Sequence, residues 1–95
     1  MAAYFIVDVK VEDPTTYEEY RKRVNATLER YGGKFLARGG ATETIEGDWQ
    51  PERLVILEFA DTAQFKRWYH SPEYSEAKEI RLKSSTARAI LVQGV

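Results

Sequence analysis

One arginine and two carboxylates are the side chains best placed for chemistry. Arg38 directly precedes two glycines at an expected strand bend, and Asp8 and Glu58 stand at strand positions where a core would prefer aliphatic residues. On simple alternation Arg38 shares a face with Leu36, and if that face also carries the acids, its guanidinium lies near both. A guanidinium there can clamp a substrate carboxylate or enolate through two parallel hydrogen bonds. The alternative is a structural ion pair with one of the acids, because buried charges are normally paired.

The two acids themselves allow two interpretations. Burial of Asp8 or Glu58 would raise its pKa and make it a general base for removing a proton next to a carbonyl, whereas pairing with Arg38 would lower the pKa. The competing interpretation is that both acids belong to ion pairs at a dimer interface. Two acids and one arginine make a constellation of side chains, which is less specific than a motif.

His70 is the only histidine of the chain. A proton shuttle that titrates near neutrality is therefore this residue or a perturbed carboxylate. His70 also falls at the end of an expected helix, where a cation meets the negative end of the dipole, so helix capping is the alternative role. One histidine cannot form a multi-histidine metal site, and the lack of cysteine excludes thiolate sites. A single proximal haem ligand is conceivable at His70, but nothing else in the sequence supports it, so we expect no metal and no cofactor.

Three aromatic residues are candidate ligand contacts. Trp49 lies in a polar turn, where its indole could close over a ligand or could anchor the turn to a dimer partner, since Trp is enriched at interfaces. Tyr20 and Tyr69 belong to helical stripes that are typical of a core. Either of these tyrosines could still direct its hydroxyl into a cavity.

Alternating and helical patterns predict the elements that must position these side chains. Strands are expected over about 4–11, 34–38, 53–60 and 86–95. Helices are expected over about 14–31, about 62–70 and a shorter stretch that starts at Pro72. After the bend at Gly39-Gly40, where a bulge would change the faces of the side chains, residues 41–45 are expected to continue the second strand. That strand and the third would form a hairpin.

Helix boundaries carry their own signals. Asp13, Asp61 and Ser71 each stand where a side-chain oxygen can accept a hydrogen bond from the first turn of a helix. Gly32 can adopt the left-handed conformation that ends the first helix. On the third helix, Tyr74, Ala77 and Ile80 are expected to form the buried side.

The order of these elements predicts an α+β fold. Strand, helix, strand, strand, helix and strand, with a helical insert before the last strand, give two interleaved βαβ units and a four-stranded antiparallel sheet of the ferredoxin-like kind. The alternates expected to face the helices are Phe5, Val7, Val9, Val55, Leu57, Phe59, Ile90 and Val92. The other face would carry Tyr4, Ile6, Asp8, Leu54, Ile56, Glu58, Ala89, Leu91 and Gln93. That face is too apolar for water, so a second subunit's sheet is expected to cover it.

Length and charge narrow the classes of protein. Ninety-five residues make a single domain over 1–95, and so short a chain gains from a partner that covers more surface. Fifteen acidic and fourteen basic residues give no excess of positive charge, so we expect neither nucleic acid nor an anionic membrane as a partner. Without a basic leader or a long apolar run, the chain is expected in the cytoplasm.

Four stretches of the sequence, taken in order, carry a family resemblance. They are Tyr31-Gly32-Gly33-Lys34-Phe35-Leu36-Ala37-Arg38-Gly39-Gly40, Glu46-Gly47-Asp48-Trp49 with Pro51 and Arg53, Glu58-Phe59, and Trp68-Tyr69-His70-Ser71-Pro72-Glu73-Tyr74. Together they resemble the DUF1330 family, small bacterial proteins of uncharacterised function, over nearly the whole chain. The resemblance implies a dimeric α/β-barrel, in which two ferredoxin-like sheets pack face to face around a cavity. Relatives in that group include cofactor-free monooxygenases, muconolactone-type isomerases and haem-handling enzymes, so the resemblance implies no single chemistry.

Two functions remain open on the sequence. The first is a cofactor-free enzyme for a small carbonyl or carboxylate metabolite, in which Arg38 stabilises an oxyanion and Glu58, Asp8 or His70 moves a proton. The second is a homodimer without catalytic activity, either structural or binding a small ligand. An open pocket that exposes Arg38 would favour chemistry or binding, and a fully paired Arg38 would favour a structural role.

Overall fold

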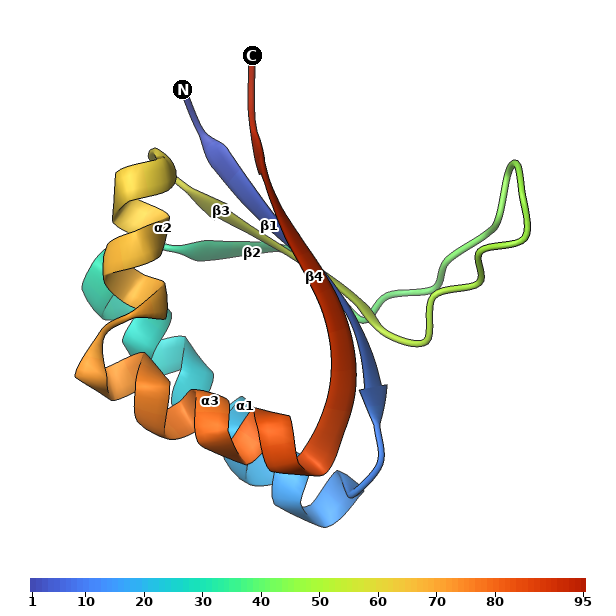
Figure 1. The fold of residues 1–95 in the computed structure, drawn as a ribbon, viewed down its shortest axis with the longest axis horizontal. Helices are drawn as coiled ribbons and strands as arrows, with labels where there is room; N and C mark the ends of the chain where they lie inside the picture. The colour runs from blue at the N-terminus through green and yellow to red at the C-terminus, as the bar shows by residue number, and fades with distance from the viewer.

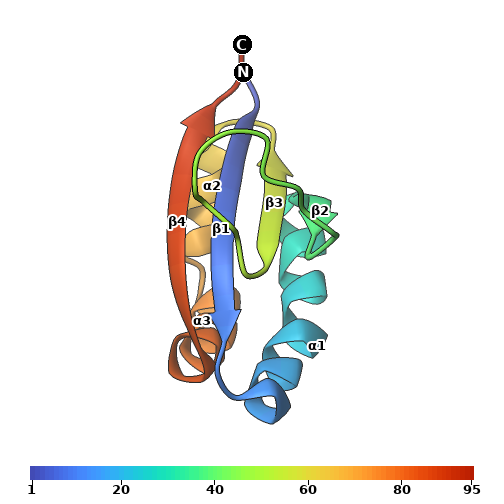
Figure 2. The ribbon, with the colours of Figure 1, turned by 90° about the vertical axis from the view of Figure 1, so that its right-hand side faces the viewer.

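The computed structural model describes residues 1–95 and confirms the predicted α+β fold. The elements are β1 (Ala3–Val11), α1 (Pro14–Tyr31), β2 (Lys34–Arg38), β3 (Leu54–Phe59), α2 (Thr62–Tyr69), α3 (Pro72–Ser84) and β4 (Ser85–Gln93). The strands form one antiparallel sheet in the order β2-β3-β1-β4. All three helices cover one face of this sheet, and the other face is open (Figures 1 and 2). None of the helices is long and apolar enough to cross a membrane.

Each helix begins where the sequence predicts. The Asp13 carboxylate accepts a hydrogen bond from the Thr16 amide, the Asp61 carboxylate from the Gln64 amide, and the Ser71 hydroxyl from the Tyr74 amide. These side chains satisfy first-turn amides that have no partner within the helix. Gly32 ends α1 in the left-handed conformation, with φ 73°.

The core lies between the helices and the sheet. Strands β1 and β3 contribute the buried residues Phe5, Val7, Val9, Leu57 and Phe59, as predicted. The helices contribute an aromatic cluster in which Trp68 and Tyr74 are fully buried, with ring centroids 3.8 Å apart. The Trp68 indole donates to the Thr27 hydroxyl at 3.0 Å, which satisfies its one polar group. This cluster fixes α3 against α1.

The predicted faces of β4 are wrong. Ile90 lies opposite Ile6, and Val92 lies opposite Tyr4, so both belong to the open face, where they are 62% and 44% exposed. Leu91, opposite Phe5, packs on the core instead. Alternation divides a strand into two sets but cannot say which set faces inward when both are apolar.

The predicted continuation of β2 is also wrong. Residues 39–53 form no strand, and we call them the 39–53 loop. The register shift falls between Phe35 and Ala37 instead of at Gly39-Gly40. Since β3 begins only at Leu54, residues 41–45 have no neighbouring strand to pair with. The loop stands away from the helices, on the open side of the sheet (Figures 1 and 2).

Candidate functional site

The bulge in β2 places Arg38 on the helix-covered face. Arg38 lies opposite Val55, which in turn lies opposite the buried Val7. Its guanidinium stacks 4.4 Å from the centroid of the Phe35 ring. The expected neighbourhood of Arg38, Asp8 and Glu58 is therefore wrong, because the extra residue in the bulge reverses the face of Arg38.

Arg38 lines a small cavity between the sheet and helices α1 and α3, which we call the arginine cavity. Its volume is about 30 Å³, and it is lined by fourteen residues, ten of them hydrophobic. The charged ones are Arg21 of α1, Arg38 of β2, Arg53 just before β3, and Arg81 of α3. No Asp or Glu lines it. A space of this size has room for about two water molecules or a very small ligand.

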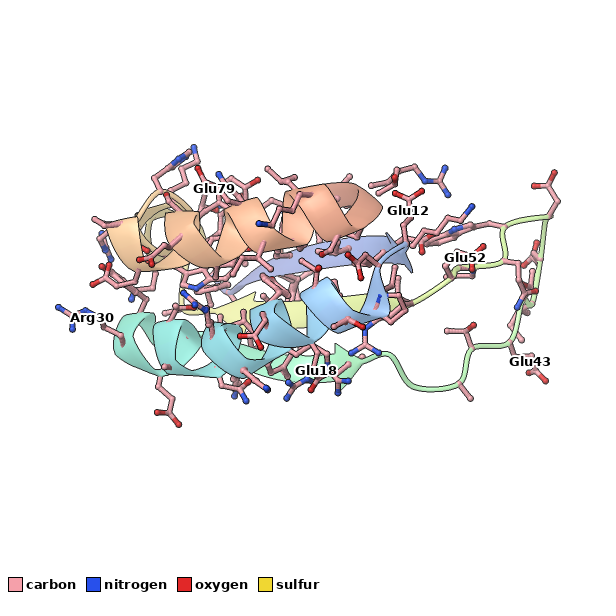
Figure 3. All side chains as sticks on the ribbon, turned by 90° about the horizontal axis from the view of Figure 1, so that it is seen from below. Glu12, Glu18, Arg30, Glu43, Glu52 and Glu79 are labelled. Carbon is pink, nitrogen blue, oxygen red and sulfur yellow. The ribbon has the colours of Figure 1, made fainter.

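Acidic side chains on the helices stay outside the cavity lining, although Glu18 lies beside its rim, 3.4 Å from Nη1 of Arg21. In Figure 3 the labelled Glu18 and Glu79 lie on the outer sides of α1 and α3, and both are exposed. The labelled Glu43 and Glu52 lie on the 39–53 loop. The positive charge of the cavity is therefore not balanced by acids that line it.

Arg53 is held at the mouth of the cavity by a glycine. Gly39 has φ 71°, and a methyl group added there would clash with Nη1 of Arg53. Only glycine leaves space for the guanidinium and tolerates this backbone conformation. The Nε of Arg53 is buried without a hydrogen-bond partner. Arg53 is half-buried, whereas Arg21 and Arg38 are exposed.

The inner end of the cavity holds Tyr20, Tyr74 and Arg81, which are only 9%, 0% and 5% exposed. The two hydroxyls are 3.0 Å apart, and Nε of Arg81 donates to the Tyr74 hydroxyl at 3.3 Å. Burial raises the pKa of both tyrosines, and the Tyr74 hydroxyl adds to the effect on Tyr20. Both phenols are therefore neutral hydrogen-bond donors at physiological pH.

Asp8 and Trp49 meet on the open face. Oδ2 of Asp8 accepts a hydrogen bond from the Trp49 indole at 3.1 Å, Oδ1 accepts from the Glu52 amide at 3.0 Å, and Arg88 approaches at 3.5 Å. The Trp49 bond is the largest cause of the lowered pKa of Asp8. Trp49 thus anchors the 39–53 loop to the chain's own β1 while its ring stays 51% exposed. The loop and sheet enclose a groove of about 650 Å³ that includes Asp8, Trp49 and Arg88.

The other candidates lie apart from the arginine cavity. Glu58 forms an ion pair with Lys34 at 3.0 Å, which lowers its pKa and keeps the carboxylate charged. His70 is an exposed C-cap of α2, and its backbone N–H donates to the Lys66 carbonyl. Tyr69 is half-buried, with the Lys78 ammonium 4.2 Å from its ring centroid. Of the candidate set, only Arg38 and Tyr20 line the cavity.

Sequence reasoning missed Arg53, Tyr74 and Arg81 as site residues. A signal existed for Arg81, because Tyr74, Ala77 and Arg81 have the i, i+3, i+7 spacing of one helix face. An arginine on an otherwise buried stripe is an unusual choice. The expected inner residue, Ile80, is only half-buried.

Comparison with known proteins gives a family and a fold. The family described as Domain of unknown function (DUF1330) matches residues 2–95. No curated protein matches the chain. The structure resembles RPA0582, a protein of unknown function from Rhodopseudomonas palustris, with 20% identity over 99% of this chain and 82% of that one (TM-score 0.79).

Two further solved structures share the fold. A dimeric ferredoxin-like protein of unknown function from Jannaschia sp. CCS1 is 12% identical over 99% of this chain and 100% of that one (TM-score 0.75). SnoaB, a cofactor-independent oxygenase from Streptomyces nogalater, is 18% identical over 99% of this chain and 93% of that one (TM-score 0.68). At these identities the likeness shows the ferredoxin-like fold alone.

Proposed function

The chain belongs to the DUF1330 family, and from that premise and the geometry of its site we propose that it is a homodimer whose arginine cavity binds a small organic anion. The observation that carries the proposal is the set of four arginines and no acid around one apolar cavity. Among the four, Arg81 is buried and Arg53 is half-buried, and neither has an ion pair. Buried charges are costly unless they are paired, so such a cavity favours a ligand that brings the missing negative charge.

Elsewhere in the molecule arginines do find acids. Arg23 pairs with Glu76, Arg30 with Glu73, and Arg88 with Asp8. Even Arg21, at the rim of the cavity, has a surface pair with Glu18 at 3.4 Å. Three arginines have no ion pair at all while lining the cavity: Arg38, Arg53 and Arg81. Outside the cavity only the exposed Arg67 lacks an ion pair, so the unpaired arginines gather at the cavity.

The walls narrow the class of ligand. Guanidinium groups bind carboxylates through paired hydrogen bonds, and apolar walls such as Val9, Val24 and Val55 favour a hydrocarbon body next to the charge. The cavity of about 30 Å³ admits only a very small carboxylate as it stands. A metabolite of ordinary size enters only if the exposed side chains of Arg21 and Arg38 swing outward.

Catalysis receives less support than binding. Asp8, Glu58 and His70, the side chains expected to move a proton, lie outside the cavity lining. A structural relative, SnoaB, is a cofactor-independent oxygenase, so this fold can carry chemistry without a cofactor. We assign a binding function to this chain and no reaction.

A second copy of the chain is the proposed cover of the open face. That face carries a strip of apolar side chains, exposed or half-buried, on all four strands: Leu36, Ile6, Ile56, Ile90 and Val92. A contiguous apolar strip of this kind marks an interaction surface. The Jannaschia relative with the same fold is dimeric, which favours a copy of the same chain over an unrelated partner.

Titration calorimetry with acetate, against acetamide as the uncharged isostere, tests the binding function. The buffer should lack carboxylate and phosphate and contain little salt, because anions compete and salt screens charge. Acetate should bind and acetamide should not. Arg38→Ala should lose about tenfold or more in acetate affinity, and Arg67→Ala, an exposed arginine outside the cavity, should lose none. Equal binding of acetate and acetamide, or binding of neither, would contradict the proposal.

A further inference from the structure

The Tyr20 and Tyr74 hydroxyls at the inner end of the arginine cavity have more hydrogen-bond donors than the protein offers acceptors. Nε of Arg81 can only donate, so the Tyr74 oxygen accepts that bond. The Tyr20 and Tyr74 hydroxyls share one further bond at 3.0 Å, and either of them can be its donor. Two hydroxyl hydrogens are therefore available for one bond.

The remaining hydrogen has no acceptor in the protein, whichever direction the shared bond takes. If Tyr74 donates to Tyr20, the Tyr20 hydrogen is left over, and if Tyr20 donates, the Tyr74 hydrogen is left over. Both tyrosines line the cavity and neither hydroxyl makes another protein bond except with Arg81. A buried donor without an acceptor costs free energy, which an oxygen atom placed at the inner end would recover.

Arg81 adds an uncompensated charge at the same place. Its side chain makes one hydrogen bond, through Nε, and has no ion pair although the residue is 5% exposed. A guanidinium has five N–H donors, so four of them remain for a ligand. The C-terminal end of α3, where Arg81 lies, supplies only a partial negative charge. A full negative charge on a ligand would complete the pairing.

We propose that Tyr20, Tyr74 and Arg81 form an oxyanion site that receives the charged oxygen of a small monocarboxylate at the inner end of the cavity. The inference rests on the proposed function and adds to it the orientation of the ligand. One carboxylate oxygen lies at the inner end against Tyr20, Tyr74 and Arg81, and the other is turned toward Arg38 and Arg53 at the mouth. The hydrocarbon body lies against the apolar walls. Phosphate and sulfate, which are polar on every side, match these walls poorly.

The neutral state of the phenols sets the pH behaviour of this site. Burial raises the pKa of Tyr20 and Tyr74, so both keep their hydrogens throughout the physiological range. Arg81 stays charged over the same range. No histidine, aspartate or glutamate lines the cavity. Acetate affinity should therefore be constant between about pH 6 and 9, where acetate itself is ionised.

Removal of the two hydroxyl groups tests the site. Tyr20→Phe combined with Tyr74→Phe keeps both rings in the core and should lower acetate affinity about tenfold or more. Each single variant should lose less, because the surviving hydroxyl can turn its hydrogen to the ligand. Tyr31→Phe is the matched control, since its hydroxyl bonds to Glu73 outside the cavity at 3.0 Å. Unchanged acetate affinity in a folded double variant would overturn the inference.

A second measurement uses the wild-type chain and so does not depend on the folding of a variant. With the ζ carbon of all six tyrosines labelled with carbon-13, acetate should shift the resonances of Tyr20 and Tyr74 and leave that of Tyr31 in place. If acetate binds in an Arg38-dependent manner and these two resonances stay still, the oxyanion site is wrong and the proposed function stands. If acetate does not bind at all, the proposed function itself fails.

Discussion

On the open face of the sheet, Asp8 and Glu58 each contact a cation, whereas on the helix-covered face Arg38 and Arg81 contact no acid. Both faces carry charged side chains among apolar ones. They differ in whether those charges have partners of opposite charge within the chain. The acids of the open face are satisfied within the chain, by Lys34, Arg88 and the Trp49 indole. The arginines of the helix-covered face, Arg38, Arg53 and Arg81, have no ion pair within the chain, and the proposed anion would supply the missing negative charge.

This difference indicates a separate role for each face. Paired charges on the open face fix the 39–53 loop beside the apolar strip that we propose as the dimer interface. Unpaired charge beside apolar walls is costly, which is why we propose that the cavity binds an anion. Changes on one face should therefore leave the property of the other face unaltered.

The largest expected effect is on the stability of the helix-covered face. Phe59 is 1% exposed and packs its ring on Phe65 and Trp68. Phe59→Ala should lower the free energy of unfolding by about 3–5 kcal/mol, at every protein concentration. Ile90→Ala on the open face should lose stability only where the dimer is populated, so its loss should vanish on dilution. Urea unfolding at two protein concentrations measures both, and a dilution-independent loss in Ile90→Ala would contradict the contrast.

The next largest expected effect is that dimer formation and acetate binding can be lost separately. Ile90→Asp places a charge in the apolar strip at a position that is 62% exposed in the single chain, so the fold should survive and the dimer should dissociate. Sedimentation velocity should show a monomer that still binds acetate. Arg38→Ala should give the reverse result, a dimer that has lost most of its acetate affinity. The two-face account would be wrong if Ile90→Asp abolished both properties.

A smaller effect should follow from a single methyl group at the cavity mouth. Gly39→Ala forces the left-handed backbone on a residue with a side chain, at about 1–2 kcal/mol, and displaces the Arg53 guanidinium. Acetate affinity should fall by roughly the worth of one charged hydrogen bond, about tenfold. Gly40→Ala is the matched control, since an added methyl group there meets nothing within 4 Å. Equal acetate affinity in the two variants would remove Arg53 from the site.

The smallest expected effect is the release of the 39–53 loop by acid. The hydrogen bond from the Trp49 indole is the largest cause that holds the pKa of Asp8 below its ordinary 3.8. The contact is therefore fully present above pH 3.8 and is lost as the pH falls through the lowered pKa. In a Trp68→Phe background, Trp49 is the only indole. Its fluorescence emission should change below pH 3.8, while the far-UV circular dichroism spectrum shows that the fold is retained.

Asp8→Asn provides the comparison for that titration. The Asn side chain lacks the charge that attracts Arg88 and accepts a weaker hydrogen bond from Trp49. The Trp49 emission of this variant at neutral pH should therefore already resemble that of the protein with Asp8 at acid pH. An emission spectrum that is the same in both proteins at neutral pH would show that the carboxylate does not hold the loop.

The sequence predicts most of the fold because local signals agree with the global arrangement. The caps Asp13, Asp61 and Ser71 and the alternation of β1 and β3 lead directly to the observed order of elements. The face of β4 could not be predicted in this way, since Ala89, Ile90, Leu91 and Val92 are all apolar. The register in which β4 pairs with β1 determines which of these side chains face the helices, and alternation within β4 does not predict that register.

The candidate site was only half predictable, and the reason lies in β2. A one-residue bulge between Phe35 and Ala37 reverses the face of Arg38 and separates it from Asp8 and Glu58. Bulges depend on pairing across strands and have no reliable signature within one strand. Arg53 likewise reaches the cavity only because Gly39, fourteen positions earlier, leaves space for it.

Proton–nitrogen spectra of the arginine Nε groups during an acetate titration test the central claim most directly. The wild-type chain is used, and each resonance is assigned from a single arginine substitution. Acetate should shift the Nε resonances of Arg38, Arg53 and Arg81, which line the cavity, and acetamide should shift none of them. The exposed Arg67 and Arg30 should not respond to either compound. Shifts confined to exposed arginines, or no shift at saturating acetate, would contradict an anion site on the helix-covered face.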